Sequence, residues 1–209
     1  MKKRDVLLAA LAILIFWQLS ALIINRNILP SPITVIQVFF RELFNGNMFE
    51  HATASLWRVM ASMFLSVALA APAGLILGQS QRLNRIFSPV IYLLYPIPKV
   101  VLVPIVLLFL GIGDFSKIVI IFMILFFQIL VLVRDQAAAL PSELIQSVRS
   151  LGAGRRALFR FVYLPARLPA ILTALRQSVG TAVAVLYIAE LIATQRGLGY
   201  YIYFNGSTL

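Results

Sequence analysis

Residues 59–81 read VMASMFLSVALAAPAGLILGQSQ, and no side chain in this stretch is charged. A helix that crosses a bilayer needs about 20 consecutive, mostly apolar residues. The stretch is therefore long enough to span a membrane. A second charge-free run, Val6 to Asn25, lies nearer the N-terminus. Together the two runs predict an integral membrane protein.

The composition of the whole chain supports this prediction. Of its 209 residues, 61% are hydrophobic and 12% are charged, whereas soluble domains average about 45–50% apolar and about 25% charged residues. The absence of cysteine excludes disulfide and thiol chemistry. The formal charge is +11, but the basic residues lie mostly in short loops between apolar runs. We therefore attribute the charge to membrane topology and expect no nucleic-acid partner.

Hydropathy and proline positions predict an all-α integral membrane protein with about five transmembrane helices. Basic residues precede the first run as in a signal peptide, but the run is long and no small-residue cleavage site follows it, so we interpret it as an uncleaved span. Segment 87–112 would cover about 39 Å as one helix, against a hydrocarbon core of about 30 Å. Pro96 and Pro98 predict a kink, with the first piece tilted or interfacial and the second piece crossing. The five spans are expected at about 6–24, 57–78, within 87–112, 116–133 and 168–193.

The distribution of basic residues predicts the orientation of the chain, because Lys and Arg are more frequent in cytoplasmic loops. With the N-terminus in the cytoplasm, the outside segments hold only Arg26, Arg41, Lys117 and Arg196, with Arg58 at the outer edge of the second span. The inside segments then hold Lys2, Lys3, Arg4, Arg82, Arg85, Arg134, Arg149, Arg155, Arg156, Arg160 and Arg167. We therefore expect a multi-pass protein whose N-terminus is cytoplasmic.

Two shorter features lie around the second span. Apolar residues at helical spacing in 34–44 predict a short amphipathic helix, which could lie at the membrane surface or pack on the bundle. Gly74 and Gly78 form a small-xxx-small pattern, which lets two helix backbones approach closely. This close approach could be within the chain or across a dimer.

The segment 134–167, between the fourth and fifth spans, is too long and too patterned for a simple connector. A helix is expected to begin at 141–143, where Ser142 can cap it and Glu143 complements the helix dipole in the first turn. Gly152 suits a left-handed turn after that helix. A second helical stretch, 155–163, should then run until Pro165 stops it. The residues alone leave two interpretations open: a basic surface element attracted to anionic lipid, or a docking element for a partner protein.

The spacing within this segment resembles the EAA loop of binding-protein-dependent ABC permeases. The family pattern is Glu-Ala-Ala, three residues, Gly, nine residues, Ile, one residue, Leu-Pro. Here the triplet reads Gln-Ser-Val, while the glycine and Leu-Pro are retained. The resemblance implies a cytoplasmic coupling helix that inserts into a groove of a separate ATPase. The residues implied in this coupling are Glu143, Gln146, Ser147, Val148, Leu151, Gly152, Val162, Leu164 and Pro165.

Other segments are similar to the nitrate/sulfonate/taurine branch of these permeases: 95–99 with Pro104, 111–117, 189–193 and 197–200. The resemblance implies a single permease domain, residues 1–209, in the bacterial cytoplasmic (inner) membrane. The implied function is inward transport of a small solute, often an anion in this family, by alternating access. The implied partners are an ATP-binding subunit, a solute-binding protein and a second copy of the permease. This branch usually has six spans, so we expect the final span to be absent here, through truncation or natural variation.

No catalytic residue, metal site or cofactor is expected in this chain. It contains no Walker A pattern, so ATP and Mg²⁺ should be bound by a partner subunit. It also lacks the HExxH and Gly-x-Ser-x-Gly patterns of hydrolases, and His51 is its one histidine. Two other functions stay open: an ATP-independent carrier or channel, and a membrane scaffold whose basic loop binds lipid.

Three residues are candidates for lining a substrate pathway: Lys99, Tyr187 and Glu190. Charges inside a bilayer are costly and tend to face a cavity or a partner. Lys99 could attract an anionic substrate or snorkel to the inner surface. Glu190 could line the pathway, bind a group on the third or fourth span, or face outside water. For Tyr187, a packing or interface position is favoured over a substrate contact.

Overall fold

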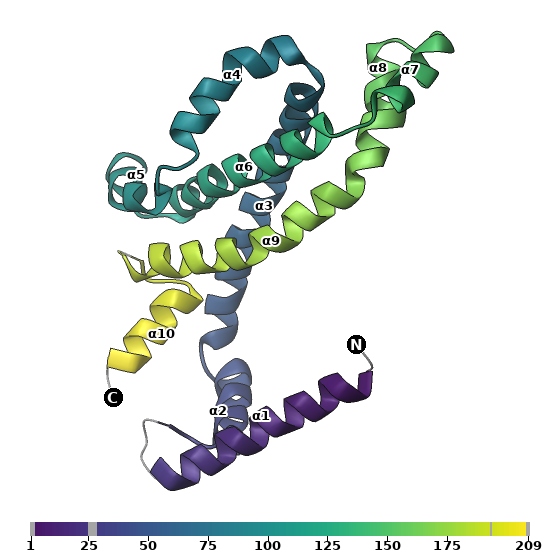
Figure 1. Ribbon diagram of the computed structural model, residues 1–209. Helices are drawn as coiled ribbons and strands as arrows, with labels where there is room; N and C mark the ends of the chain where they lie inside the picture. The colour runs from purple at the N-terminus through teal and green to yellow at the C-terminus, as the bar shows by residue number, and fades with distance from the viewer. Residues whose placement is uncertain (1–2, 25–28, 193, 208–209) are drawn as a thin grey trace. The chain divides into compact units, whose positions relative to one another are not determined.

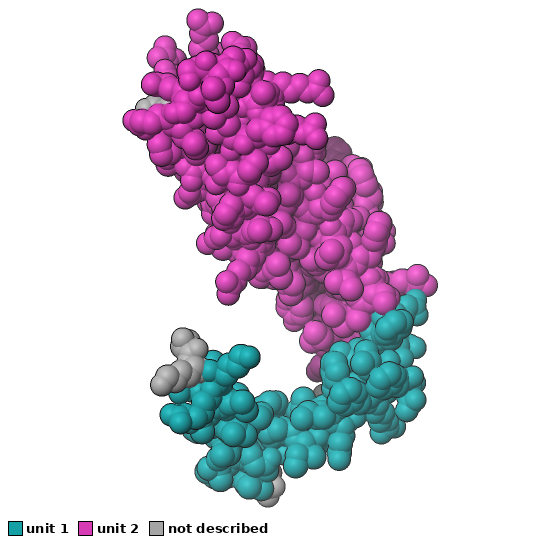
Figure 2. Space-filling model, turned by 90° about the vertical axis from the view of Figure 1, so that its right-hand side faces the viewer, with its two compact units in different colours: residues 1–51 teal, residues 52–209 magenta. Residues whose placement is uncertain are grey.

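The computed structural model describes residues 3–24, 29–192 and 194–207, and every regular element within these ranges is a helix (Figure 1). The chain forms two compact units, residues 1–51 and 52–209 (Figure 2). Four positions named in the sequence analysis lie outside the described residues: Lys2, Asn25, Arg26 and Ala193.

Unit 1 contains α1 (Lys3–Ile24) and α2 (Pro32–Asn45). The first confirms that the first expected span is helical, and the second confirms the expected short helix. Ser31 caps α2 by accepting a hydrogen bond from the backbone N–H of Thr34 at 3.3 Å. The side chains of Ile36, Phe40 and Phe44 are exposed on α2. Whether these side chains meet a membrane surface or a helix bundle stays a prediction.

Unit 2 holds the remaining helices. They are α3 (Met48–Gln79, which begins just before the boundary), α4 (Gln81–Leu94), η1 (Lys99–Leu102), α5 (Val103–Leu110), α6 (Asp114–Ala138), α7 (Ser142–Ser150), α8 (Arg155–Leu158), η2 (Phe159–Tyr163), α9 (Leu164–Leu191) and α10 (Leu198–Ser207). The described residues contain four helices long and apolar enough to cross a membrane, and a fifth span if α4 and the helices after it are counted as one bent segment. This confirms the all-α membrane fold with about five spans.

Helices α3 and α6 run parallel. Ser62 Oγ donates to the carbonyl of Ile118 at 3.3 Å, and one turn further on Ser66 lies 3.5 Å from the carbonyl of Phe122. In both pairs the partners are 56 residues apart in the sequence. A constant separation arises only when two helices advance in the same direction, so α3 and α6 must cross the bundle in the same sense.

The two glycines of α3 continue this contact. A Cβ atom on Gly74 would lie 2.9 Å from the carbonyl oxygen of Leu130, and one on Gly78 would collide with the carbonyl oxygen of Arg134. The small-xxx-small pattern therefore brings α3 against α6 within the chain. Of the two packing arrangements that the sequence left open, the structure shows this one.

The chain between these parallel helices bends sharply, as Pro96 and Pro98 predict. Helix α4 and the segment Lys99–Leu110 meet at 73°. The expectation that the second piece crosses alone is wrong, because Lys99–Leu110 covers about 18 Å, well short of a core of about 30 Å. Since α3 and α6 are parallel, both pieces together must return the chain from the end of α3 to its beginning.

The expectation that Pro165 stops the second loop helix is also wrong. The helix continues from α8 through the π turn η2 into α9, and Pro165 lies in the first turn of α9. The N–H of Leu164 bonds to the carbonyl of Phe159, five residues back. Proline lacks an N–H and its ring clashes with the carbonyl four residues back in an α-helix. Here the wider π turn changes the hydrogen-bond register directly before Pro165. The loop is thus joined to α9 without a break.

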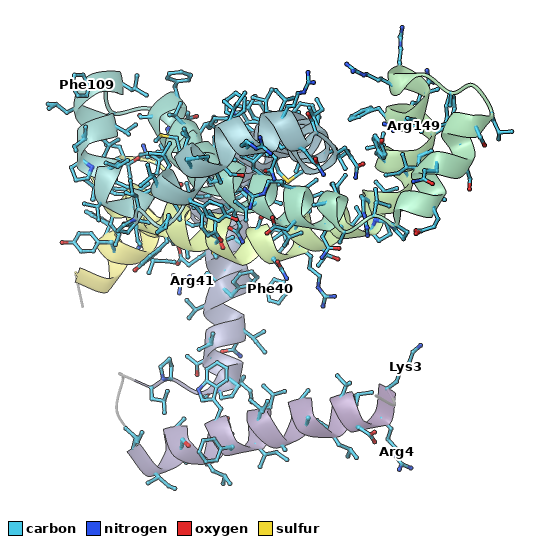
Figure 3. The ribbon with its side chains drawn as sticks, turned by 45° about the horizontal axis from the view of Figure 1, so that its top comes forward. Lys3, Arg4, Phe40, Arg41, Phe109 and Arg149 are labelled. Atoms are coloured by element: carbon cyan, nitrogen blue, oxygen red, sulfur yellow. The ribbon has the colours of Figure 1, made fainter. Side chains whose placement is uncertain are left out.

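The core of unit 2 lies where α3, α6 and α9 meet, and α6 and α9 lie side by side along most of their length (Figure 1). Leu75, Ile121, Leu125 and Ala182 are fully buried there. Large apolar side chains on the outside are exposed, such as Phe109 on α5 (Figure 3), which is 80% exposed. This distribution is typical of a chain that meets lipid or a partner rather than water.

Candidate functional site

The loop between α6 and α9 forms one end of unit 2, which we call the loop end. Helix α7 begins at Ser142, which therefore lies in its first turn rather than at its cap as expected, and Glu143 lies in the same turn. Gly152, two residues after the last residue of α7, has φ +83°. The N–H of Gly152 donates to the carbonyl of Arg149 at 2.9 Å. The expected left-handed glycine turn is thus confirmed, and it reverses the chain tightly enough for α7 to fold back on α8.

The loop has a small core of its own. Leu158, Val162 and Tyr163 are buried, and Ile145 and Val148 of α7 pack against them. Because these contacts join α7 to the helix that continues into α9, the helix-turn-helix is one packed body.

The expected coupling residues divide into a packed set and an exposed set. Val162 is buried and Val148 is half-buried, so both hold the loop together. Leu151, at the tip beside the glycine turn, has 84% of its surface exposed. The other six are exposed: Glu143, Gln146, Ser147, Gly152, Leu164 and Pro165. An apolar side chain at the tip of a rigid element suits a groove on another protein.

At the opposite end of α3 lies a buried ion network, which we call the network end. The side chain of Arg58 is only 3% exposed. Its Nη1 lies 2.5 Å from Glu190 Oε1, and its Nη2 lies 2.7 Å from Asp114 Oδ1. Arg58 Nη1 also donates to the carbonyl of Arg196 at 2.8 Å. A single guanidinium group therefore ties together α3, α6, α9 and the segment before α10.

Glu190 also holds the start of α10. Its Oε2 accepts the backbone N–H of Gly199 at 2.8 Å, and both its oxygens accept Ser55 Oγ, at 2.8 and 2.9 Å. The N–H of Leu198 donates in turn to Ser55 Oγ at 2.8 Å. Two N–H groups that α10 cannot satisfy internally are thus satisfied by side chains of α3 and α9. Gly197, with φ +134°, leaves room for this approach, because a Cβ there would collide with the Glu190 carboxylate.

The expectations for Glu190 need two corrections. Glu190 is 1% exposed, so it does not face outside water. Its side-chain partners are on α3, not on the third or fourth span. The sequence placed Arg58 at the edge of the second span, but local patterns did not predict that it pairs with Glu190, because 132 residues separate the two. The available signal was that Arg58, Asp114 and Glu190 all lie near the same expected membrane surface.

A hollow of about 560 Å³ opens beside the network. Arg58, Asp114, Lys117 and Arg196 line it, together with uncharged residues. Lys117 is 1% exposed, and its Nζ donates to the carbonyl of Gly113 at 3.3 Å. In the described ranges, no three His, Cys, Asp or Glu side chains gather as a metal site would require.

Lys99 lies at the proline break. Its Nζ donates to the carbonyls of Leu94, Tyr95 and Ile97 at 2.8, 3.2 and 3.4 Å, and it lies 4.5 Å from the ring centroid of Phe127. These carbonyls lose their helical partners at the break, so Lys99 stabilises the bend. Lys99 also lines a groove of about 390 Å³. A substrate contact by Lys99 stays a prediction.

Tyr187 lies on α9 and is 41% exposed. Its carbonyl oxygen is close to Gly199, at which a Cβ would lie 2.9 Å away. The three pathway candidates therefore have different surroundings: Lys99 the bend, Glu190 the buried network and Tyr187 the outside of α9. Contact of Tyr187 with a substrate stays a prediction.

Comparisons with known proteins give a consistent result. The family described as the binding-protein-dependent transport system inner membrane component matches residues 70–203. The chain is 32% identical to the taurine transport system permease protein TauC of Escherichia coli, over 96% of this chain and 75% of that protein. It is 28% identical to an aliphatic sulfonates transport permease protein, SsuC, of Bacillus subtilis, over 95% of this chain and 72% of that protein.

The fold also matches a solved structure. An inward-facing structure of the MetNI methionine ABC transporter contains a chain that aligns with a TM-score of 0.67, covering 76% of this chain and 79% of that one. Sequence identity in this alignment is 23%. The likeness supports the helical arrangement described above.

Proposed function

The chain belongs to the family of binding-protein-dependent transport system inner membrane components, and from this premise we propose that it moves a small solute inward by alternating access, driven by a separate ATPase. Its similarity to taurine and sulfonate permeases makes it an ABC permease of the nitrate/sulfonate/taurine type and a multi-pass inner-membrane protein. The solute, the driving subunit and the motion belong to the proposal.

One observation carries the coupling step. The exposed tip of the loop, with Leu151 at 84% exposure, is packed on a helix that continues into α9. An ATPase that moves the tip therefore moves α9, and α9 is bonded through Glu190 to α3 and α10. Rigid-body displacement of spanning helices is the physical basis of alternating access. Segment 134–167 is thus proposed as a cytoplasmic coupling loop within one permease domain, residues 1–209.

The remaining partners follow from the family and the relatives. We propose that a solute-binding protein delivers the solute on the outside and that a second copy of the permease completes the pathway. ATP and Mg²⁺ are bound by the ATPase, not by this chain. The names of TauC and SsuC support a small sulfonate-like anion as the solute. The basic loop end supports a cytoplasmic N-terminus.

Co-purification tests the docking step. Expressed with its ATPase subunit, the chain should retain that subunit through purification. An ATPase that does not bind removes the main support for the proposal. Uptake that persists after ATP depletion and without an ATPase would instead establish an ATP-independent carrier.

Two glycine substitutions test the coupling step. Gly152→Val places a β-branched residue at φ +83°, which costs about 1–2 kcal/mol, although no atom lies within 4 Å of the new Cβ. We expect solute-dependent uptake to fall by about tenfold, as about 1.4 kcal/mol of distortion predicts, while ATP hydrolysis continues. Both activities are measured on the complex in proteoliposomes.

Gly154→Val is the matched control. It adds the same side chain two residues away, where φ is −76° and no atom lies within 4 Å. Uptake should therefore stay near the unmodified level. Full coupled uptake in the Gly152→Val complex would contradict the coupling role of the turn.

A further inference from the structure

A cavity of about 660 Å³ lies at the loop end, between the α3–α4 junction and the coupling loop. It is lined by four arginines, by three polar side chains and by apolar residues. The lining residues are Leu75, Ile76, Gln79, Ser80, Arg82, Leu83, Arg149, Arg155, Arg156, Leu158, Phe159 and Tyr163. Nothing in the proposed transport function requires this cavity.

The charge in this cavity is unbalanced. Its lining contains Arg82, Arg149, Arg155 and Arg156 but no carboxylate. Within the described part of the chain, ion pairs are formed by Arg58 and Arg134 and by none of these four. All four side chains are exposed, and guanidinium groups stay charged at any physiological pH, so together they give this surface a positive potential that attracts anions.

The walls of the cavity are apolar. Ile76 and Leu83 line it and are 47% and 37% exposed, and Phe159 contributes part of the wall. A free inorganic anion would gain nothing from these surfaces. They suit a ligand that carries a hydrocarbon chain beside its negative charge.

The cavity also lies at the depth of lipid headgroups. The charge-free run 59–81 of α3 is long enough to cross the hydrocarbon core, and Arg82 follows it directly. Arg149 is on α7, in the loop region (Figure 3), and it lines the same cavity as Arg82, so the cavity connects the end of a span to the coupling helix.

We propose that this cavity binds an anionic phospholipid. The phosphate lies among Arg82, Arg155 and Arg156, and an acyl chain lies along Ile76 and Leu83. Basic pockets between transmembrane helices are suited to anionic headgroups, and the arginine fork matches phosphate geometry. Such a lipid would join the α3–α4 junction to the coupling loop.

Two double variants of equal charge test the proposal. Arg82→Gln with Arg156→Gln removes one arginine of α4 and one of α8, both in the cavity. Arg85→Gln with Arg160→Gln removes one arginine of α4 and one of η2, both exposed and outside it. The full chain, in complex with its ATPase, is titrated in a neutral detergent with phosphatidylglycerol, and bound lipid is counted by native mass spectrometry.

The cavity variant should bind phosphatidylglycerol about 25-fold more weakly, since each basic side chain near an anionic lipid contributes about fivefold. The control variant should bind as the unmodified chain does. Ile76→Asp should weaken lipid binding while leaving all four arginines in place. Equal lipid binding by the two double variants would overturn the proposal.

Two further measurements distinguish an anionic lipid from other anionic ligands. If inorganic phosphate displaces the lipid at a comparable concentration, the site recognises phosphate alone and the lipid proposal is wrong. If the cavity variant loses the ATPase but keeps the lipid, the arginines serve an acidic protein surface and the proposal is again overturned. Retained ATPase with lost lipid supports it.

Discussion

Arg58 supplies the buried positive charge that pairs with the carboxylates at the network end. It contacts two carboxylates, and the one on Glu190 is as buried as Arg58 itself. Removing one member of a buried ion pair costs about 3–5 kcal/mol, because the other charge is left without a partner. Asp114, whose side chain is 51% exposed, can be hydrated instead.

We therefore expect a rescue between two substitutions. Arg58→Met should lower the free energy of unfolding by about 3–5 kcal/mol, by leaving Glu190 charged and buried. Adding Glu190→Gln should recover part of this loss, because Gln keeps an oxygen for the Gly199 N–H but carries no charge. Denaturation of the purified chain in one detergent measures the cycle.

Asp114→Asn serves as the comparison. Because this carboxylate is half-exposed, its loss should cost only about 1 kcal/mol or less. A double variant less stable than Arg58→Met alone would contradict the assignment of Glu190 as the uncompensated charge.

The sequence did not predict which side chains form hydrogen bonds and ion pairs with distant partners. The charge of Glu190 and its position near a span end were evident, but its partners Ser55 and Arg58 are more than 130 residues away. Local periodicity reports which face of a helix is apolar, not which distant helix covers that face. The left-handed turn at Gly152 was predictable, because it depends only on the backbone conformation of that residue.

At the scale of elements, the contact between α3 and α6 depends on backbone proximity. Gly78 is in a helix, where alanine is normally favoured by about 1 kcal/mol. Its Cβ position is nevertheless occupied by the carbonyl of Arg134 and the side chain of Ala137. Packing should therefore outweigh helix propensity here.

We expect opposite signs from the same substitution at two glycines. Gly78→Ala should destabilise the chain by about 1–3 kcal/mol, as overpacking does. Gly180→Ala, in α9 with no atom within 4 Å of the new Cβ, should stabilise it by up to about 1 kcal/mol. Thermal unfolding of the two variants in the same detergent compares them, and stabilisation by both would show that α3 and α6 are not in close contact.

The helices themselves were largely predictable, because long apolar runs determine them locally. The prediction that Pro165 ends a helix was wrong, because that outcome depends on the hydrogen-bond register of the helix. Pro165 would end a regular α-helix, yet one π turn lets the helix pass it. The bend at Pro96 and Pro98 was predictable, but not the short second arm, since proline marks a break without setting the length of either side.

At the scale of the molecule, the two ends of unit 2 should face opposite sides of the membrane. Because the chain contains no cysteine, single cysteines report on this without background. Ser150→Cys, exposed at the loop end, should react with an impermeant maleimide only after cells are permeabilised. Gln195→Cys, exposed beside the network, should react in intact cells. The reverse pattern would invert the proposed orientation.

The long-range pairing of Arg58 also has a consequence for how the chain is made. Its partners Asp114 and Glu190 follow it by 56 and 132 residues. At about 5–20 residues per second, a ribosome adds Glu190 about 7–26 s after Arg58. Once α3 is complete, the guanidinium group of Arg58 therefore has no buried counter-charge until Glu190 has been made. The network end can close, with the docking of α10 onto Glu190, only after that point.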